Sequence, residues 1–255
     1  MLVLYFSGTG NSKYISEQFV IRMKAPCYSI EENVDFENLL QETDTVAVSY
    51  PIYGSCVPMI MRKFVQQYLG IFQTKKLVIF CTQMLFSGDG ARAFARLIPG
   101  CDEHVIYAEH FRMPNNICNF FVFPMREKEL VQKPQKALLK IEEICQDIQN
   151  GVVKKRGWNI FSTLLGKTQN IAYPKIEQKA KSSFQVDKDC IQCGICVKHC
   201  PMNNLKIVDG KVMESGQCTL CYRCVNICPK QSATVYIHRK PKKQYKGFEY
   251  TQKEL

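Results

Sequence analysis

Eight cysteines near the C-terminus are the residues whose types and spacing point most directly to chemistry. They form two copies of the pattern C-x₂-C-x₂-C-x₃-C-P, one ending at Pro201 and the other at Pro229. Because every position of the second copy follows its counterpart by the same 28 residues, the motif is an internal duplication. The eight residues are Cys190, Cys193, Cys196, Cys200, Cys218, Cys221, Cys224 and Cys228.

This spacing is typical of ligands for [4Fe–4S] clusters. Three closely spaced thiolates can face three irons of one cube, while the fourth, carried away by the x₃ step and the proline, ligates the other cluster. We therefore predict two clusters. The first is expected to bind Cys190, Cys193, Cys196 and Cys228, and the second Cys218, Cys221, Cys224 and Cys200. A pair of zinc sites is the alternative, but zinc gains nothing from a third evenly spaced cysteine.

Residues 181–238 resemble the bacterial two-cluster [4Fe–4S] ferredoxins, because all eight ligands and both prolines are present. Gly194 supplies a small residue in the first motif, whereas Tyr222 and Arg223 stand in the second. This difference predicts that the two clusters lie in different environments. His199 lies between cluster ligands, and we expect it near the surface or close to a ligand without binding iron.

The composition limits the cellular setting and the number of domains. A chain of 255 residues with 46% hydrophobic residues is long enough for one large core and a smaller appendage. A glycine-rich loop stands where a signal peptide would need an apolar segment, and no run is long enough for a membrane span. Fourteen cysteines in such a chain indicate metal or redox chemistry. We expect a cytoplasmic protein.

The first 150 residues alternate short β-rich runs with helical stretches. The expected strands cover residues 2–6, 25–30, 45–53, 76–82 and 104–111, and a helix is expected from about Ser12 to Arg22. Five strands with helices between them predict an α/β domain with a doubly wound parallel sheet. Ligands of such sheets bind beyond the carboxyl ends of the strands.

The loop SGTGNS follows the first strand and opens the first helix, where backbone N–H groups and the helix dipole receive a phosphate. A dinucleotide fingerprint would need a third glycine at the position of Lys13. The hydroxyls and the amide side chain instead suit the terminal phosphate of a mononucleotide. The expected phosphate ligands are Ser7, Gly8, Thr9, Gly10, Asn11 and Ser12. A plain β–α turn with Ser12 as a helix cap is the alternative.

This loop is similar to the phosphate loop of flavodoxins, with Ser12 in place of the family's second threonine. The resemblance implies FMN, bound also by the loops after the third and fourth strands. The residues implied there are Pro51, Ile52, Tyr53, Gly54, Thr82, Gln83 and Gly88. Tyr53 is the first choice for stacking on the flavin and Phe86 the second. The segment 112–121 is expected to reach the same mouth.

As a whole, the chain resembles the flavodoxin–ferredoxin fusion proteins of anaerobic bacteria and archaea. This resemblance implies domains at residues 1–150 and 181–238, with a flavodoxin-like five-stranded sheet followed by a small α+β two-cluster ferredoxin. It also implies electron transfer between FMN and the clusters. Two other functions stay open: an FMN-dependent oxidoreductase of a small molecule such as a quinone, and an iron–sulfur redox sensor.

Two basic segments flank the ferredoxin-like region. In the linker 151–180, Trp158, Phe161 and Leu165 recur at helical spacing, which is compatible with a helix at a membrane surface. We favour a segment packed at the seam between the domains. Residues 239–255 are expected to form a solvated basic tail.

The net charge of +11 falls to about +5 once two clusters and one FMN phosphate are counted. A basic holoprotein would attract an acidic ferredoxin or flavodoxin as redox partner. No nucleic-acid-binding motif is present in the sequence.

Overall fold

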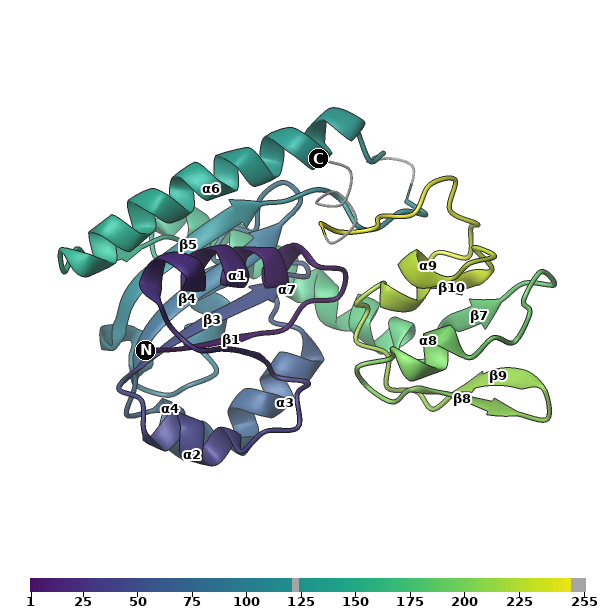
Figure 1. The fold of residues 1–255 in the computed structure, drawn as a ribbon, viewed down its shortest axis with the longest axis horizontal. Helices are drawn as coiled ribbons and strands as arrows, with labels where there is room; N and C mark the ends of the chain where they lie inside the picture. Colours follow the sequence, from purple (N-terminus) through teal and green to yellow (C-terminus); the bar gives the residue numbers. More distant parts are fainter. Residues whose placement is uncertain (121–123, 249–255) are drawn as a thin grey trace. The chain divides into compact units, whose positions relative to one another are not determined.

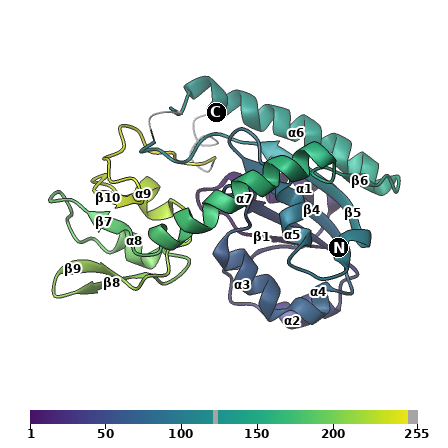
Figure 2. The same cartoon turned by 180° about the vertical axis from the view of Figure 1, so that it is seen from behind.

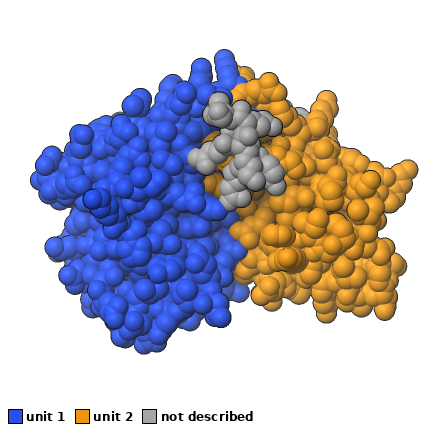
Figure 3. Space-filling model, in the orientation of Figure 1, with its two compact units in different colours: residues 1–7, 11–113, 128–173 blue, residues 8–10, 114–127, 174–255 orange. Residues whose placement is uncertain are grey.

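The computed structural model describes residues 1–120 and 124–248. The chain divides into two compact units, which Figure 3 colours separately. Unit 1 comprises residues 1–7, 11–113 and 128–173, and unit 2 comprises residues 8–10, 114–127 and 174–255. The predicted linker residues up to 173 thus belong to unit 1.

Unit 1 is built on a parallel sheet with the strand order β2-β1-β3-β4-β5-β6 (Figure 1). The strands are β1 (Leu2–Tyr5), β2 (Cys27–Ser29), β3 (Thr45–Pro51), β4 (Lys76–Gln83), β5 (Val105–Arg112) and β6 (Lys154–Lys155). The order of the first five strands is that of a flavodoxin-like doubly wound sheet. The predicted fold class is therefore confirmed.

The sheet has six strands where the sequence predicts five. The additional strand, β6, pairs Lys154 and Lys155 with Tyr107 and Ala108 of β5. Two lysines carry no apolar alternation, so the sequence gives no signal for this strand. The central strands are easier to recognise because both faces are covered: Val46, Val48 and Ile79 are almost fully buried.

Helices cover both faces of the sheet. Helix α1 (Asn11–Met23) lies in front of the sheet in Figure 1, beside α6 (Glu127–Gln149), to which Arg22 and Glu142 join it at 2.9 Å. Figure 2, from behind, shows α5 (Gly90–Ala95) and α7 (Ile160–Ala180) on the opposite face. The remaining helices of unit 1 are α2 (Phe36–Gln41), α3 (Met59–Gln67), α4 (Leu69–Phe72) and the 3₁₀ turn η1 (Cys101–Glu103).

Unit 2 contains two small antiparallel sheets and two short helices. One sheet pairs β7 (Phe184–Val186) with β10 (Ala233–Val235), and the other pairs β8 (Leu205–Val208) with β9 (Lys211–Glu214). The helices are α8 (Ile195–Lys198) and α9 (Arg223–Ile227). Each helix includes the third cysteine of its motif, Cys196 or Cys224, so the duplication in sequence is also a duplication in structure.

The C-terminal segment differs from the predicted solvated tail. Gln244 donates hydrogen bonds to the carbonyls of Val225 and Cys228, and the backbone N–H of Tyr245 donates to Asn226. Tyr245 is buried. These residues therefore pack on α9, while residues 249–255 of the predicted tail lie outside the described part of the chain. Among the described helices, none has the length and apolar character needed to span a bilayer.

Candidate cluster and flavin sites

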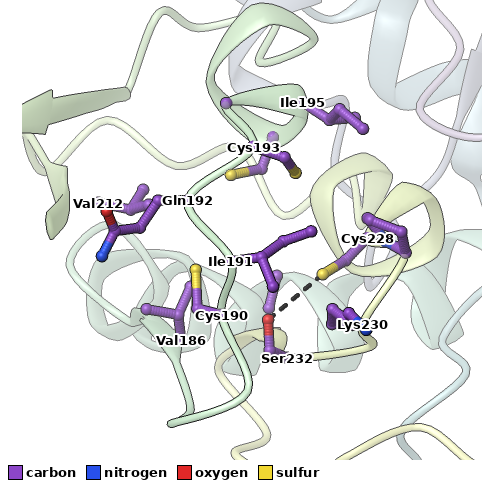
Figure 4. A pocket seen from close by; sticks show the side chains of 14 residues that line it. Val186, Cys190, Ile191, Gln192, Cys193, Ile195, Val212, Cys228, Lys230 and Ser232 are labelled. Atoms are coloured by element: carbon purple, nitrogen blue, oxygen red, sulfur yellow. Dashed lines mark hydrogen bonds between the residues drawn. The ribbon is translucent and has the colours of Figure 1, made fainter. Parts of the chain in front are cut away.

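The first cysteine motif lines a small cavity in unit 2 (Figure 4). Its walls include Cys190, Cys193 and Cys196 from the loop before α8 and from α8 itself. Cys228, which directly follows α9, lines the same cavity. These are the four cysteines that the spacing assigns to one cluster, although Cys228 belongs to the other copy of the motif.

The second group gathers around Cys218 and Cys224. Burial raises the pKa of Cys218 to about 12, and the charges of Cys221 and Cys200 add to the shift. The same two neighbours, together with Cys218, contribute to the raised pKa of Cys224 after burial. Such crowded, buried thiols ionise only when a positive charge compensates them. Iron would supply that charge.

The donor set fits clusters better than single metal ions. A zinc ion draws its sulfur ligands to about 2.3 Å from one centre, whereas a cube of four irons holds its ligands farther apart. The Oγ1 atom of Thr219, beside Cys218, is buried and has no hydrogen-bond partner in the described chain. A cluster sulfur would give this hydroxyl an acceptor.

The backbone repeats the duplication in detail. Three pairs of non-helical positions, each pair 28 residues apart, have positive φ; these pairs are Gln192 and Leu220, Gly194 and Tyr222, and Asn203 and Gln231. Gly194 (φ 72°) and Tyr222 (φ 59°) each precede a short helix. A side chain in this left-handed conformation costs about 1–2 kcal/mol. Tyr222 offsets that cost by burying its ring, which is 6% exposed.

The two motifs lie in different surroundings, as the contrast between Gly194 and Tyr222 predicts. Ile191 of the first motif is 57% exposed, whereas its counterpart Thr219 is 2% exposed. Cys193 is likewise exposed and its counterpart Cys221 buried. The first site therefore opens to solvent, and the second is the more enclosed of the two.

Residues 8–10 of the SGTGNS loop belong to unit 2 and pack against the second motif. A Cβ atom on Gly8 would overlap the carbonyl oxygen of Cys221. The guanidinium of Arg223 donates from Nε to the Gly8 carbonyl and from Nη1 to the His199 carbonyl, both at 3.1 Å. Arg223 thus ties the loop to the residue that precedes Cys200.

The other side of this loop segment contacts two further parts of unit 2. Asn116 donates from Nδ2 to the Thr9 hydroxyl at 2.8 Å. The Cα of Gly247 lies 3.6 Å from where a Cβ of Gly10 would be. Segment 112–121 is predicted from the sequence to reach the mouth of the flavin site, and its residue Asn116 contacts the opening loop. Residue 121 lies outside the described part of the chain.

The remaining residues of the loop belong to unit 1. Ser7 follows β1 after one residue, and Asn11 begins α1. The Ser12 hydroxyl lies 2.9 Å from the Thr82 hydroxyl, and the Ser49 hydroxyl donates to the Ser12 carbonyl at 3.2 Å. Two predicted flavin ligands, Ser12 and Thr82, thus bond to each other and join the carboxyl ends of the strands.

Gln83 gives the clearest sign of a missing partner at this edge of the sheet. It ends β4, is 8% exposed, and its Oε1 atom has no hydrogen-bond partner within the described residues. Because buried polar atoms are nearly always paired, this oxygen fits a donor of a bound ring such as a flavin. Ile52, after Pro51 at the end of β3, donates its backbone N–H to Thr82 and fixes the neighbouring loop.

Helix α7 contacts the loops after β3 and β4, which contain the predicted flavin ligands Tyr53, Gly54 and Gly88. Tyr53 and Cys56 close a tight turn through two backbone hydrogen bonds, and the Tyr173 ring of α7 lies 6.3 Å from the Tyr53 ring. A Cβ on Gly54 would meet Tyr173, and one on Gly88 would meet the backbone of Gly166 at 2.6 Å. The close approach that Gly88 permits is therefore that of a helix. Phe86 is 55% exposed.

Sequence reasoning missed His110, whose ring contacts Ser87 and Ala91 in the segment after β4. Its Nε2 atom accepts the backbone N–H of Ala91 at 3.1 Å, and its Nδ1 lies 3.4 Å from the Ser87 hydroxyl. Burial, followed by the charges of Arg156 and Lys140, lowers the His110 pKa to about 3. The imidazole is therefore a neutral acceptor. A lone histidine within a strand carries no sequence signal for this role.

Comparisons with known proteins match two different families to two parts of the chain. The model of the flavodoxin domain family matches residues 2–118, and that of the 4Fe-4S dicluster domain family matches residues 189–232. A ferredoxin from Methanothermococcus thermolithotrophicus is 39% identical over 46 residues, which are 17% of this chain and 77% of the ferredoxin.

Two further matches are partial. The "Putative electron transport protein YccM" of Escherichia coli (strain K12) is 31% identical over 90 residues, 34% of this chain. The chain spans only 22% of the length of that protein. The two-electron reduced flavodoxin of Megasphaera elsdenii matches 55% of this chain and 99% of its own, with 19% identity and a TM-score of 0.38.

The two family models and the ferredoxin match agree with the parallel sheet of unit 1 and the duplicated cysteine motif of unit 2. The cofactors of these two families are FMN and [4Fe–4S] clusters. The chain belongs to the flavodoxin–ferredoxin fusion family of iron–sulfur flavoproteins.

Proposed function

We propose that this protein passes single electrons between FMN and a redox partner through two [4Fe–4S] clusters in a fixed order. In this order the cluster of Cys218, Cys221, Cys224 and Cys200 lies next to FMN, and the cluster of Cys190, Cys193, Cys196 and Cys228 exchanges electrons with the partner. A flavin supplies two-electron storage and one-electron release, and each cluster carries one electron. The electron-transport description of YccM agrees with this role.

The contact between Gly8 and Cys221 carries the proposal. Gly8 belongs to the expected FMN phosphate loop and Cys221 to the expected ligands of the second cluster, and their backbones touch. Arg223 holds this contact through the Gly8 carbonyl. A phosphate bound at the loop would bring the flavin end of the pathway to the second motif.

The exposure of the first motif supports its place at the end of the pathway. Ile191 and Ile195 around it are 57% and 36% exposed, so a partner can approach this cluster closely. Lys230 lines its cavity. Together with the net charge of the chain, this favours an acidic ferredoxin or flavodoxin as the partner. The cytoplasmic location stays a prediction.

Flash reduction under anaerobic conditions tests the order. Electrons are delivered to the FMN of the holoprotein by a photoreduced donor, and bleaching of the clusters is followed by visible absorbance. Cys190→Ser should keep the fast bleaching of the second cluster. Cys218→Ser should leave the electron on FMN, with slow reduction of the first cluster.

Arg223→Gln retains every cysteine and serves if the cysteine variants fold poorly. It should slow the fast phase while the iron content stays at the parent level. Fast reduction of the first cluster in Cys218→Ser would contradict the proposed order, and an unchanged fast phase in Arg223→Gln would remove the role of the Gly8 contact.

A further inference from the structure

Helix α7 has its apolar face turned toward solvent. In a surface helix the apolar stripe normally faces the core and the polar side faces water. Here Ile160, Phe161, Leu164 and Ile171 are 84%, 85%, 63% and 74% exposed. Their spacing of three, four or seven positions places them on one side of the helix.

The opposite side of α7 is polar or small, and it packs on unit 1. Thr163 accepts a hydrogen bond from Arg92 at 3.2 Å, Gln169 bonds to Ser55, and Cys56 donates to Asn170 at 3.0 Å. These contacts come from helix α5, which contains Arg92, and from the loop after β3, which contains Ser55 and Cys56. They hold the helix in this rotation.

Gly166 is a second reason why α7 cannot turn about its axis to bury its apolar side. A Cβ at this position would overlap the carboxylate of Asp89, which is fully buried and paired with Arg96. Rotating the helix to bury its apolar side would place a side chain against this buried charge. The packing of α7 within unit 1 therefore requires its apolar side to face outward.

The charges within the segment 148–176 of the sequence are all positive, although Lys154 and Arg156 form ion pairs with Glu143, Asp147 and Glu109 of other segments. From residue 148 to residue 176 the sequence contains no Asp or Glu, but it contains Lys154, Lys155, Arg156, Lys167 and Lys175. Lys167 and Lys175 lie on α7 itself and are exposed. Monomeric proteins rarely expose a contiguous apolar patch without a binding role.

We propose that the first turns of α7 dock this protein on an anionic lipid bilayer. Phe161, Leu164 and Ile171 would enter the boundary of headgroups and acyl chains, as apolar faces of interfacial helices do. The lysines would meet anionic headgroups, each contributing about fivefold in affinity. A second copy of the chain fits less well, because it would bring two surfaces of the same positive sign together.

Vesicle flotation of the full holoprotein under anaerobic conditions tests this proposal. The vesicles consist of phosphatidylcholine, with or without phosphatidylglycerol. The parent protein should float with the anionic vesicles and bind more weakly as salt is raised. The triple variant Phe161→Ser, Leu164→Ser, Ile171→Ser should lose at least about a hundredfold in partitioning, since each side chain contributes about tenfold.

A matched control replaces exposed apolar residues elsewhere on unit 1. Ile21, Val131 and Leu139 are 66%, 58% and 69% exposed, and their triple serine variant should bind vesicles like the parent. Equal loss in both triple variants, or absence of the parent from the anionic vesicles, would overturn the proposal. So would a dimer of the parent, seen by sedimentation without lipid, that only the α7 variant abolishes.

Discussion

The two cysteine motifs of unit 2 have the same spacing and the same backbone conformations, yet one opens to solvent and the other is enclosed. Ile191 and Cys193 are exposed, whereas their counterparts Thr219 and Cys221 are buried. The enclosed copy also contacts Gly8 of the opening loop.

Under the proposed order of electron transfer, the two copies of the motif would serve the two ends of one pathway. The ligand positions must be repeated because the cluster geometry is the same, so the copies can diverge only at the residues between the cysteines. Tyr222 and Arg223 are such residues: Tyr222 stands at the position of Gly194 and is buried, and Arg223 donates a hydrogen bond to the Gly8 carbonyl. The first copy is left free for a partner.

Removal of Cys200, the cysteine that the first motif supplies to the second cluster, should have the largest effect. We expect Cys200→Ala to reduce the iron content from about eight to about four atoms per chain, with loss of the cluster beside Gly8. Iron analysis and spectroscopy of the remaining cluster measure this. Cys27, which lies far from both motifs in the sequence, provides the control substitution Cys27→Ala. Loss of the solvent-exposed cluster instead would reverse the assignment of the two copies.

A side chain at Gly8 should break the contact that distinguishes the enclosed motif. We expect Gly8→Ala to destabilise the fold by roughly 1–3 kcal/mol, because its Cβ would overlap the Cys221 carbonyl. FMN affinity should fall as well. Thermal unfolding and FMN titration measure the two effects.

Gly70→Ala is the matched control for that variant, since a Cβ there meets no described atom within 4 Å. A Gly8→Ala protein as stable as Gly70→Ala, with unchanged FMN affinity, would show that the loop and the motif are not coupled.

Gly194→Ala should have a smaller effect, set by the backbone alone. Its φ of 72° is unfavourable for alanine by about 1–2 kcal/mol, while the nearest atom to a Cβ, Cδ1 of Ile207, is 3.8 Å away. The midpoint of thermal unfolding should fall slightly, with the iron content intact. A loss of iron in this variant would mean that the open copy tolerates change less than its exposure indicates.

The smallest predicted effect concerns the buried hydroxyl of Thr219. Thr219→Val should lower the reduction potential of the enclosed cluster by about 40 mV, equivalent to about one hydrogen bond of 1 kcal/mol. Redox titration measures this shift. Ile191→Val, at the equivalent position of the open copy, should leave the reduction potentials of both clusters unchanged. A shift of the same size in that variant would mean that the Thr219 hydroxyl does not distinguish the two copies.

The sequence was sufficient for features that depend on local spacing. The cysteine motifs, the strands of the parallel sheet and the helix that follows SGTGNS all arise from patterns within a few residues of each other, whereas the flavodoxin-like arrangement of the strands was implied by the family resemblance. Strand β6 was missed because Lys154 and Lys155 pair with β5 without any apolar alternation.

Other features depend on contacts that no local pattern encodes. The spacing of Phe161 and Leu164 indicates an apolar side of α7, but only Asp89, distant in sequence, determines that this side faces outward. The packing of Gln244 on α9 likewise rests on the carbonyls of Val225 and Cys228. The neutral role of His110 rests on the N–H of Ala91.

The division of the chain has a consequence for its origin and for attempts to dissect it. An end-to-end joining of two genes would leave one connection between the units, but here the chain passes from one to the other at residues 7, 10, 113, 127 and 173. Residues 8–10 and 114–127 have therefore become part of the unit that carries the cysteines. A single proteolytic cut or truncation cannot release either unit whole. A fragment starting at residue 174 would lack Gly8 and Asn116, and a fragment ending at residue 173 would retain Gly8 without Cys221 and Asn116 without Asn226, which donates to its carbonyl.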